Sequence, residues 1–546
     1  MVNQAKIKFF FICTALVLGA ACGSASRKSA KAFKAHLVKN QFAEAEKVIR
    51  SGKFYPEDRN SLLRLMEMGT VKHLQEEYYQ SLKYFDKAAE LARKLFTKSI
   101  SKKAATFITN DSSDNFYGEK YEVSFIRFYQ AINHYKISEL GKYESYMPPL
   151  WPIPAKEEKK KSDSKDVAVI AKPIPERVLT EQERRSHLLS SRAVLLDWDS
   201  LLDNYQKSIL GKDHYKDDMT AKVLGAWIHR SLRIRADKTI AKGLYKEGEK
   251  LLFRNYNTYP TFNLLSDKFR SDFDKLPKLG AVKVKKDYIK ATGFGEELAS
   301  LLKEQRDTMY SRKKAANTMI LLTEGLISSK EAKKISFPIG FNTLPYIGGG
   351  ANKKDFVTFV RKVLAISSGA NPSISFEIPV VKSSAIHQHL KVIIKKEDGT
   401  IVTTEEVPII SPLSDISEEA LASKITAIKS RLGARLVTKH LAALAAAYVS
   451  YRTTVKKSGE AFGILIATGA YALANKGIQE SEKADLRQWS SLPNNIRAAH
   501  LRLGPGNYKV YLEAKTVAPV ENKSQRYLGD ISVPNSGFTL FKKRIL

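Results

Sequence analysis

The spacing of apolar residues changes near residue 330, and this change constrains the fold more than any other feature of the chain. Upstream, apolar side chains recur every three or four residues, which is typical of amphipathic helices. One such stripe comprises Leu188, Leu195, Trp198, Leu202, Tyr205 and Ile209. Downstream, short segments rich in Val, Ile and Phe alternate with polar residues and predict strands; they are Ser373–Val381, Leu390–Lys396, Thr400–Glu405, Arg526–Val533 and Phe538–Ile545. The sequence therefore predicts a mostly α protein, in which an irregular helical array precedes a small β-rich domain with a helical insert.

The first helical region, residues 22–147, carries the spacing of a tetratricopeptide helix pair. The positions that define this spacing are Leu65, Gly69, Ser81, Phe85 and Ala88. The small residues let two helices approach closely, and Phe85 fills the space between neighbouring pairs. Weaker matches occur over residues 37–49 and 241–248. We expect a short tetratricopeptide-like array, with a generic helical bundle as the alternative.

Composition sets the remaining domain boundaries. A linker rich in proline and charge at 148–179 separates the first helical region from a second one at 180–330. The strand domain is predicted in two parts, 331–417 and 483–546, on either side of an insert at 418–482. Sequential strands joined by a tight turn usually pair. The turn signal at 504–507 therefore predicts a hairpin, formed by His500–Leu503 and Tyr508–Ala514.

The insert at 418–482 is rich in Ala and Gly and predicts two closely packed helices. Its most apolar runs are Leu441–Val449 and Ala461–Ala474. Both are shorter than the ~20 residues that a membrane-spanning helix needs. We expect a buried helical hairpin, with insertion into a membrane as the alternative.

Residues 1–21 have the layout of a secretory signal peptide. Lys6 and Lys8 precede an apolar core, and small residues follow it directly before Cys22. This arrangement resembles a bacterial lipoprotein, in which a diacylglycerol is attached to the cysteine thiol. The alternative is ordinary cleavage near Ala25, which would leave a soluble periplasmic protein. We expect an exported protein that is lipid-anchored at Cys22, at the outer membrane and facing the periplasm.

The chain is strongly basic, with 90 Lys and Arg against 57 Asp and Glu, a formal net charge of +33. Such a charge favours polyanions as partners: lipopolysaccharide, wall polymers, anionic lipid or DNA. The basic residues are scattered along the chain, so a solvated basic surface is the alternative. Because Cys13 and Cys22 are the only cysteines, a disulfide scaffold and a zinc site built from several thiolates are excluded.

Catalytic motifs are largely missing from the sequence. The run Gly348-Gly349-Gly350 lacks the spacing of a phosphate-binding loop, and no GxSxG elbow is present. His387 and His389 would share one face of a strand, but no cysteine or nearby carboxylate completes a metal site. We therefore predict a protein that is not an enzyme and has no cofactor or metal.

One polar loop between two predicted helices is a candidate interaction site. Its residues are Thr109, Asn110, Asp111, Tyr117, Gly118 and Glu119. One interpretation is helix capping, with Asn110, Asp111 or Ser113 accepting N–H bonds from the next helix. The other is recognition of a partner at one end of the helical array. Further along, we expect Trp489 and Leu492 to wedge the end of the insert against the strand domain.

Two stretches of the chain resemble a known family. One is Phe96–Ser101 with Thr109–Asp111 and Tyr117–Glu119, and the other is Ala484–Pro493 with the turn after it. The chain is similar to a family of bacterial envelope lipoproteins that have tetratricopeptide-like N-terminal helices and a small C-terminal strand domain. Genes of this family often lie beside those for lipoproteins that activate penicillin-binding proteins. The resemblance implies a role in the cell envelope, and it supplies no catalytic residue.

These observations favour a membrane-tethered, non-enzymatic scaffold that binds another envelope protein, with a role in cell-wall or envelope assembly. A concave surface of stacked helix pairs would hold the partner. The first alternative is a basic periplasmic protein that binds lipopolysaccharide, wall polymer or DNA. A wall hydrolase is the weakest alternative, because the expected motifs are missing.

Overall fold

The computed structural model describes most of the chain after residue 25. The described ranges are 26–102, 114–148, 172–207, 215, 217–262, 294–338, 353–368, 373–382, 388–514 and 525–546. Several predicted features lie outside these residues, namely Cys22, Thr109, Asn110, Asp111, His387 and most of the linker at 148–179.

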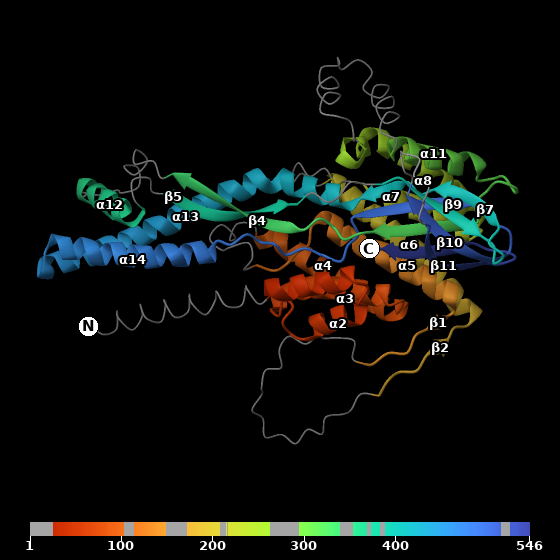
Figure 1. The fold of residues 1–546 in the computed structure, drawn as a ribbon, viewed down its shortest axis with the longest axis horizontal. Helices are drawn as coiled ribbons and strands as arrows, with labels where there is room; N and C mark the ends of the chain where they lie inside the picture. Colours follow the sequence, from red (N-terminus) through yellow and green to blue (C-terminus); the bar gives the residue numbers. More distant parts are fainter. Residues whose placement is uncertain are drawn as a thin grey trace, which may run out of the picture.

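One four-stranded sheet joins the helical and strand-rich parts of the protein (Figure 1). Its strands, in spatial order, are β12 (Thr539–Ile545), β3 (Thr318–Glu324), β9 (Asn495–Leu501) and β8 (Ile409–Pro412). β12 is parallel to β3, whereas β9 is antiparallel to both β3 and β8. The last strand of the chain therefore lies beside the first long one.

This central sheet is covered on both faces. Met319 and Leu321 of β3 belong to the core shared with the helices, whereas Ile320 and Leu322 belong to a core shared with a second sheet. The second sheet is antiparallel and contains, in order, β11 (Arg526–Val533), β10 (Gly506–Ala514), β6 (Leu390–Lys395) and β7 (Ile401–Glu406). Since successive side chains of a strand point to opposite faces, a strand buried on both sides is apolar throughout.

The helices cover the other face of the central sheet. A helix at 26–38 precedes α2 (Phe42–Arg50), η1 (Asp58–Asn60), α3 (Ser61–Leu74), α4 (Tyr78–Lys102), α5 (Lys120–Leu140), α6 (Glu181–Lys207), α7 (Met219–Ser231), α8 (Arg235–Arg254), η3 (Tyr256–Thr258), η4 (Pro260–Phe262) and α11 (Phe294–Thr308). Two short strands, β1 (Lys142–Tyr143) and β2 (Arg177–Val178), pair antiparallel between α5 and α6. The predicted class, mostly α with a small strand-rich region, is confirmed.

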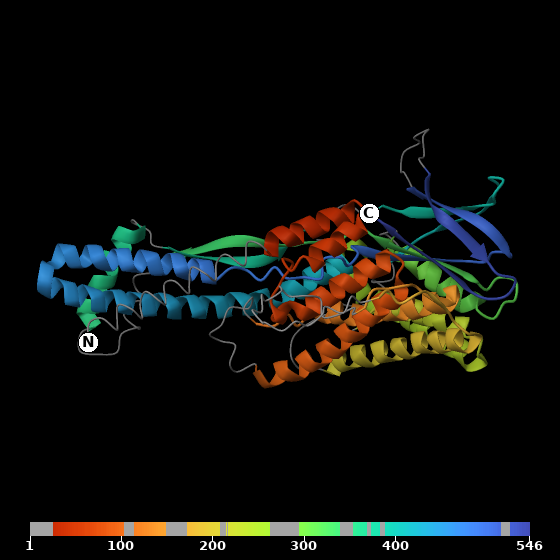
Figure 2. The ribbon, with the colours of Figure 1, turned by 90° about the horizontal axis from the view of Figure 1, so that it is seen from below.

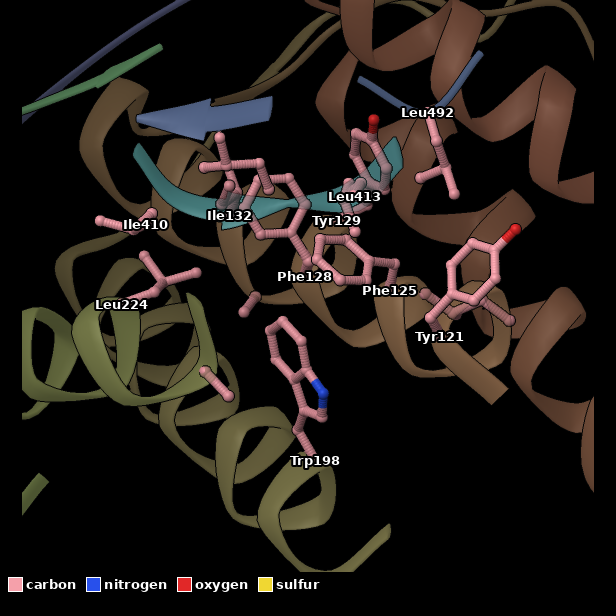
Figure 3. Close-up of a cluster of buried hydrophobic side chains, with 14 of the residues drawn as sticks. Tyr121, Phe125, Phe128, Tyr129, Ile132, Trp198, Leu224, Ile410, Leu413 and Leu492 are labelled. Carbon is pink, nitrogen blue, oxygen red and sulfur yellow. The ribbon is translucent and has the colours of Figure 1, made fainter. Parts of the chain in front are cut away.

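Helices and strands share a single large core. Figure 3 shows Trp198 of α6 beside Phe125 of α5, with ring centroids 5.5 Å apart. The Trp198 indole N–H donates to the Ser124 hydroxyl. Ile410 of β8 and Leu492, which precedes β9, belong to the same cluster. The helical array therefore depends on residues from the C-terminal third of the chain.

A long arm projects from this body in both views (Figures 1 and 2). Its main elements are α13 (Leu413–Ser458) and α14 (Glu460–Ser481), with the ribbon of β4 (Lys330–Pro338) and β5 (Ser373–Val381) and with α12 (Lys353–Ser368). We use "the arm" for β4, β5, α12, α14 and residues 422–458 of α13. Phe376 and Ile378 of the ribbon pack on Leu432 and Leu436 of α13. Nearer the tip, α12 takes over from the ribbon and packs on both helices of the hairpin.

Three sequence predictions are wrong. Residues 318–324 form β3, although we placed them in the second helical region at 180–330; an uninterrupted apolar run does not distinguish a buried strand from a helix. The hairpin predicted at 500–514 does not form, because β9 pairs with β3 and β8 whereas β10 pairs with β6 and β11. The Gly-Pro turn instead carries the chain from one sheet of the sandwich to the other.

The third wrong prediction is the buried helical hairpin. Two packed helices are present, but Leu465 and Leu473 of α14 are 64% and 74% exposed. Among the described residues, one helix, Glu460–Gln479, is long and apolar enough to cross a membrane, and only 22% of its apolar stretch is buried. The hairpin therefore buries its inner side in small cores of the arm and leaves an apolar outer side exposed.

Candidate functional site

The predicted tetratricopeptide-like positions lie together where α3 packs on α4. The Ser81 hydroxyl donates to the Gly69 carbonyl at 2.7 Å. A Cβ on Gly69 would lie 2.8 Å from Cζ of Phe85, so only glycine allows this approach. The Phe85 ring stacks on Tyr129 of α5 with centroids 4.9 Å apart, and Leu65 and Ala88 are buried in the same core. These residues hold α3, α4 and α5 together.

The chain's own segment 487–492 packs against these helices. Trp489 is fully buried, and its indole N–H donates to the Thr70 hydroxyl at 3.0 Å. Its ring lies against Phe85 and Tyr129, with centroids 5.7 and 5.5 Å away. Trp489 is therefore the centre of the helical array, which corrects its expected role as a wedge between insert and strand domain.

Buried carboxylates fix this segment in place. Glu67 of α3 accepts hydrogen bonds from the Ser490 N–H at 2.6 Å, the Ser490 hydroxyl at 2.7 Å and the Ser491 N–H at 3.1 Å. Glu122 of α5 accepts from the Trp489 N–H at 2.7 Å. Buried polar groups need hydrogen-bond partners, so these bonds hold the segment against α3 and α5.

We call the contact of residues 487–492 with α3, α4 and α5 the junction. The described part of the predicted interaction loop belongs to it. Glu119 caps α5 through a capping box with Glu122, and Gly118 has a φ of +74°, a conformation that favours glycine. The Glu119 carboxylate also pairs with Lys424 of α13 and lies 3.5 Å from Nζ of Lys330 on β4. The capping interpretation thus applies to Glu119, whereas Asn110, Asp111 and Ser113 are outside the described residues.

Burial and neighbouring charges shift the pKa values of the two glutamates of the capping box in opposite directions. Burial tends to raise the pKa of Glu119, but Lys424 and Lys330 outweigh it and lower that pKa to about 2. Burial raises the pKa of Glu122 to about 7, with Lys330 opposing it and the neighbouring Glu119 charge adding to it. Of the stretches that carry the family resemblance, residues 117–119 lie next to 484–493, which the Trp489 N–H joins to Glu122.

An open cleft lies along β12, at the edge that does not pair with β3. Its volume is about 900 Å³, and α5, α6, β11 and β12 supply most of its walls. The charged side chains that line it are Lys136, Arg184, Arg233, Lys542, Lys543, Glu76, Glu139, Glu181 and Asp530. Five cations and four carboxylates nearly balance, so the cleft does not concentrate the net positive charge of the chain.

The backbone edge of β12 faces outward into this cleft. The Thr539 N–H donates to Asn317, and the Ile545 carbonyl accepts from Gly325, so odd-numbered residues of β12 bond toward β3. Even-numbered residues consequently point their N–H and C=O groups to the free edge. Glu139 accepts from the Leu540 N–H at 3.2 Å, and Lys136 donates to the Leu540 carbonyl at 3.4 Å. Within the described part of the chain, no hydrogen bond reaches the backbone N–H or C=O of Lys542.

Lys542 has an unusual environment within the cleft. Its ammonium donates to the His73 carbonyl at 3.3 Å and lies 4.9 Å from the Tyr78 ring centroid. Burial lowers its pKa to about 7, and Lys136 and Lys543 add to this effect against Glu76. Basic residues on edge strands limit uncontrolled strand pairing. In the sequence, the run Lys542-Lys543-Arg544 is the signal for such an open edge.

Of the two histidines that we considered as a metal site, His387 lies outside the described residues and His389 has another role. His389 lies just before β6, contacts the Glu297 carboxylate at 2.5 Å and stacks on Phe294 at a centroid distance of 4.0 Å. The described residues contain no group of three or more His, Cys, Asp or Glu side chains that could hold a metal ion.

Comparison with known proteins adds no relative. No family model matches the chain, and no curated protein or solved structure matches it significantly.

Proposed function

We propose that this protein is a non-catalytic envelope lipoprotein that binds an extended segment of another envelope protein along the free edge of β12. The observation that carries the proposal is the outward-facing backbone of Lys542 at the wall of a cleft of about 900 Å³. An added strand gains main-chain hydrogen bonds from such an edge, and side-chain pockets give it specificity.

The charge of the cleft favours a protein segment over a polyanion. Lys136 pairs with Glu139 within the cleft, and Arg184 lies 3.4 Å from Glu181. A phosphate-rich polymer would need unopposed cations, whereas a peptide backbone needs hydrogen-bond donors and acceptors. The cleft offers both kinds of group.

Membrane tethering is the second part of the proposal. The expected lipid attachment at Cys22 precedes the first described residue, Ser26, by four positions, a distance of at most about 14 Å in extended chain. The adjacent Arg27 lies 3.7 Å from Glu377 of β5 and donates to the Ala484 carbonyl at 3.4 Å. A lipid at Cys22 would therefore hold the base of the arm close to a bilayer.

The tether is tested by metabolic labelling with a fatty-acid analogue. The wild-type chain is expected to incorporate the label and to sediment with membranes, whereas Cys22→Ala should lose both properties. A Cys22→Ala chain that still incorporates the label would contradict attachment at this residue.

The binding edge is tested with a photo-crosslinking amino acid at Ser536, an exposed residue that lines the cleft. Crosslinking in cells should yield a defined protein partner, and Lys542→Pro should abolish it by removing the outward N–H while leaving the bonds to β3. Lys542→Ala is the matched control, because it removes the same side chain and keeps the N–H. A crosslinker at Thr400, on the far side of the second sheet, should give no such partner. Equal crosslinking in the Pro and Ala variants would rule out strand addition.

A further inference from the structure

The outward side of α14 is apolar along most of its length. Between residues 461 and 473 its exposed residues are Ala461, Phe462, Leu465, Ile466, Gly469, Ala472 and Leu473, which recur at three- and four-residue intervals and so form one stripe. The next exposed residue is Lys476. From Phe462 to Leu473 this stripe extends about 17 Å at 1.5 Å per residue. No carboxylate or basic residue interrupts it.

The other side of α14 already has its partners. Ala467 and Tyr471 are buried against α12 and α13, and the Tyr471 hydroxyl lies 2.9 Å from Nδ1 of His440. Gly463 lies close to Val455 and Tyr451 of α13. Packing within the arm therefore accounts for the inner stripe and leaves the outer one exposed to solvent. Contiguous exposed apolar surface of this kind marks an interaction site.

The charges around the stripe have one dominant sign. Residues 420–479 contain nine Lys or Arg and a single carboxylate, Glu460. That carboxylate is paired with Lys362 of α12 at 2.7 Å. Arg452, Lys456 and Lys457 are exposed on the last turns of α13, beside the tip of the arm. An apolar stripe bordered by exposed cations is the combination that binds anionic membrane surfaces.

We propose that the arm docks on an anionic phospholipid bilayer, with α14 lying in the plane of the headgroup region and its outer stripe inserted among the acyl chains. The helix does not span the bilayer, because its inner side remains packed on α13. Near the base of the hairpin, Arg435 of α13 pairs with the buried Glu482 at 3.2 Å, and this pair stays outside the hydrocarbon.

Charge complementarity selects the bilayer over a second copy of the chain. Two copies that packed in parallel through this stripe would bring their basic tips together without carboxylates to offset them. A bilayer rich in phosphatidylglycerol supplies both the hydrocarbon for the stripe and the negative headgroups for Arg452, Lys456 and Lys457. The proposal depends neither on lipidation of Cys22 nor on the cleft at β12.

The test places an environment-sensitive fluorescent amino acid at position 465 of the full chain. With vesicles of phosphatidylglycerol and phosphatidylethanolamine, the emission should shift to the blue, and lipids with a nitroxide on the acyl chain should quench it. Phosphatidylcholine vesicles should give neither effect. The same probe at position 196, an exposed leucine on α6, should not respond to either type of vesicle.

A pair of matched variants completes the test. Leu465→Glu/Leu473→Glu should lower the fraction of probe-labelled arm that is quenched by about tenfold or more, because interfacial binding scales with buried apolar area; here the probe replaces Ile466. Leu189→Glu/Leu196→Glu changes the same residue types on α6, where they are 40% and 49% exposed, and should leave quenching unchanged.

Three results would overturn the proposal. A blue shift without vesicles would mean that a second copy covers the stripe. Quenching that is equal in both variant pairs would mean that the stripe is not the contact. Association with phosphatidylglycerol vesicles without acyl-chain quenching would mean that only the surface charge binds.

Discussion

The junction around Trp489 and the arm differ in where their apolar residues point. At the junction, Trp489 is enclosed by three helices, and its N–H groups have acceptors on Thr70 and Glu122. On the arm, Leu473 points away from every packed neighbour of α14 and is 74% exposed. Both regions contain helices that approach closely through small residues. The difference shows that close helix packing by itself does not tell whether the remaining surface is used for stability or for contact with something else.

Replacing one large apolar residue in each region gives the largest contrast. Trp489→Ala should lower the free energy of unfolding by about 4 kcal/mol, because a large buried side chain leaves a cavity. Leu473→Ala on the arm should change it by less than about 0.5 kcal/mol, as for other exposed positions. Urea denaturation followed by circular dichroism measures both values. Comparable losses in the two variants would mean that the arm is part of the core.

A buried titratable group in each region should make stability depend on pH, with opposite signs for Glu122 at the junction and His440 on the arm. Burial raises the pKa of Glu122 from an ordinary value of 4.5 to about 7. Its protonated form is thus favoured by folding, and its contribution is present below pH 4.5 and lost as the pH rises through 7. Relative to Glu122→Gln, the wild-type protein should therefore lose up to about 3 kcal/mol across this range.

His440 on the arm should behave in the reverse way. Burial lowers its pKa from 6.5 to about 4, so its contribution is present above pH 6.5 and lost as the pH falls through 4. Relative to His440→Asn, the free energy of unfolding of the wild-type protein should increase by up to about 3 kcal/mol as the pH rises from 4 to 6.5. Denaturation series at pH 4, 5, 6 and 7 measure both differences, and slopes of the same sign would refute the contrast.

A glycine in each region gives the smallest effect. Gly69→Ala should lower the free energy of unfolding by about 2 kcal/mol, because the new Cβ would lie 2.8 Å from the Phe85 ring. In Gly433→Ala on α13, the new Cβ meets no atom within 4 Å. This change should raise the free energy of unfolding by about 0.5 to 1 kcal/mol through helix propensity. Thermal unfolding of the two variants under one set of conditions gives the comparison. A stabilised Gly69→Ala protein would show that the α3–α4 approach is looser than described.

Local sequence patterns predicted much of the fold. The alternation in Ser373–Val381 and Arg526–Val533 matches the bounds of β5 and β11, and the Ala- and Gly-rich insert matches the pair α13 and α14. These elements have one solvent-facing side, so their periodicity is visible. β3 lacks this signal because helices cover one of its faces and a sheet covers the other.

The candidate site was less accessible to sequence reasoning. The positions Gly69, Ser81 and Phe85 indicated a helix pair correctly, but no local pattern shows that residues 487–492 occupy the surface beside it. That contact joins residues hundreds of positions apart, and it is decided by hydrogen bonds such as those from Ser490 to Glu67. The cleft exists because β12 is an edge strand. Its position in the sheet follows from which strands pair with each other, and no local pattern in the sequence shows that.

The bond between Trp489 and Thr70 bridges 419 positions of sequence, and this has a consequence for biogenesis. The N-terminal helices leave the ribosome long before the segment that completes them, and in an exported chain they also cross the membrane first. Closing so large a loop is entropically slow. The early helices therefore keep apolar side chains such as Phe85 and Tyr129 uncovered until residues 487–492 have been synthesised.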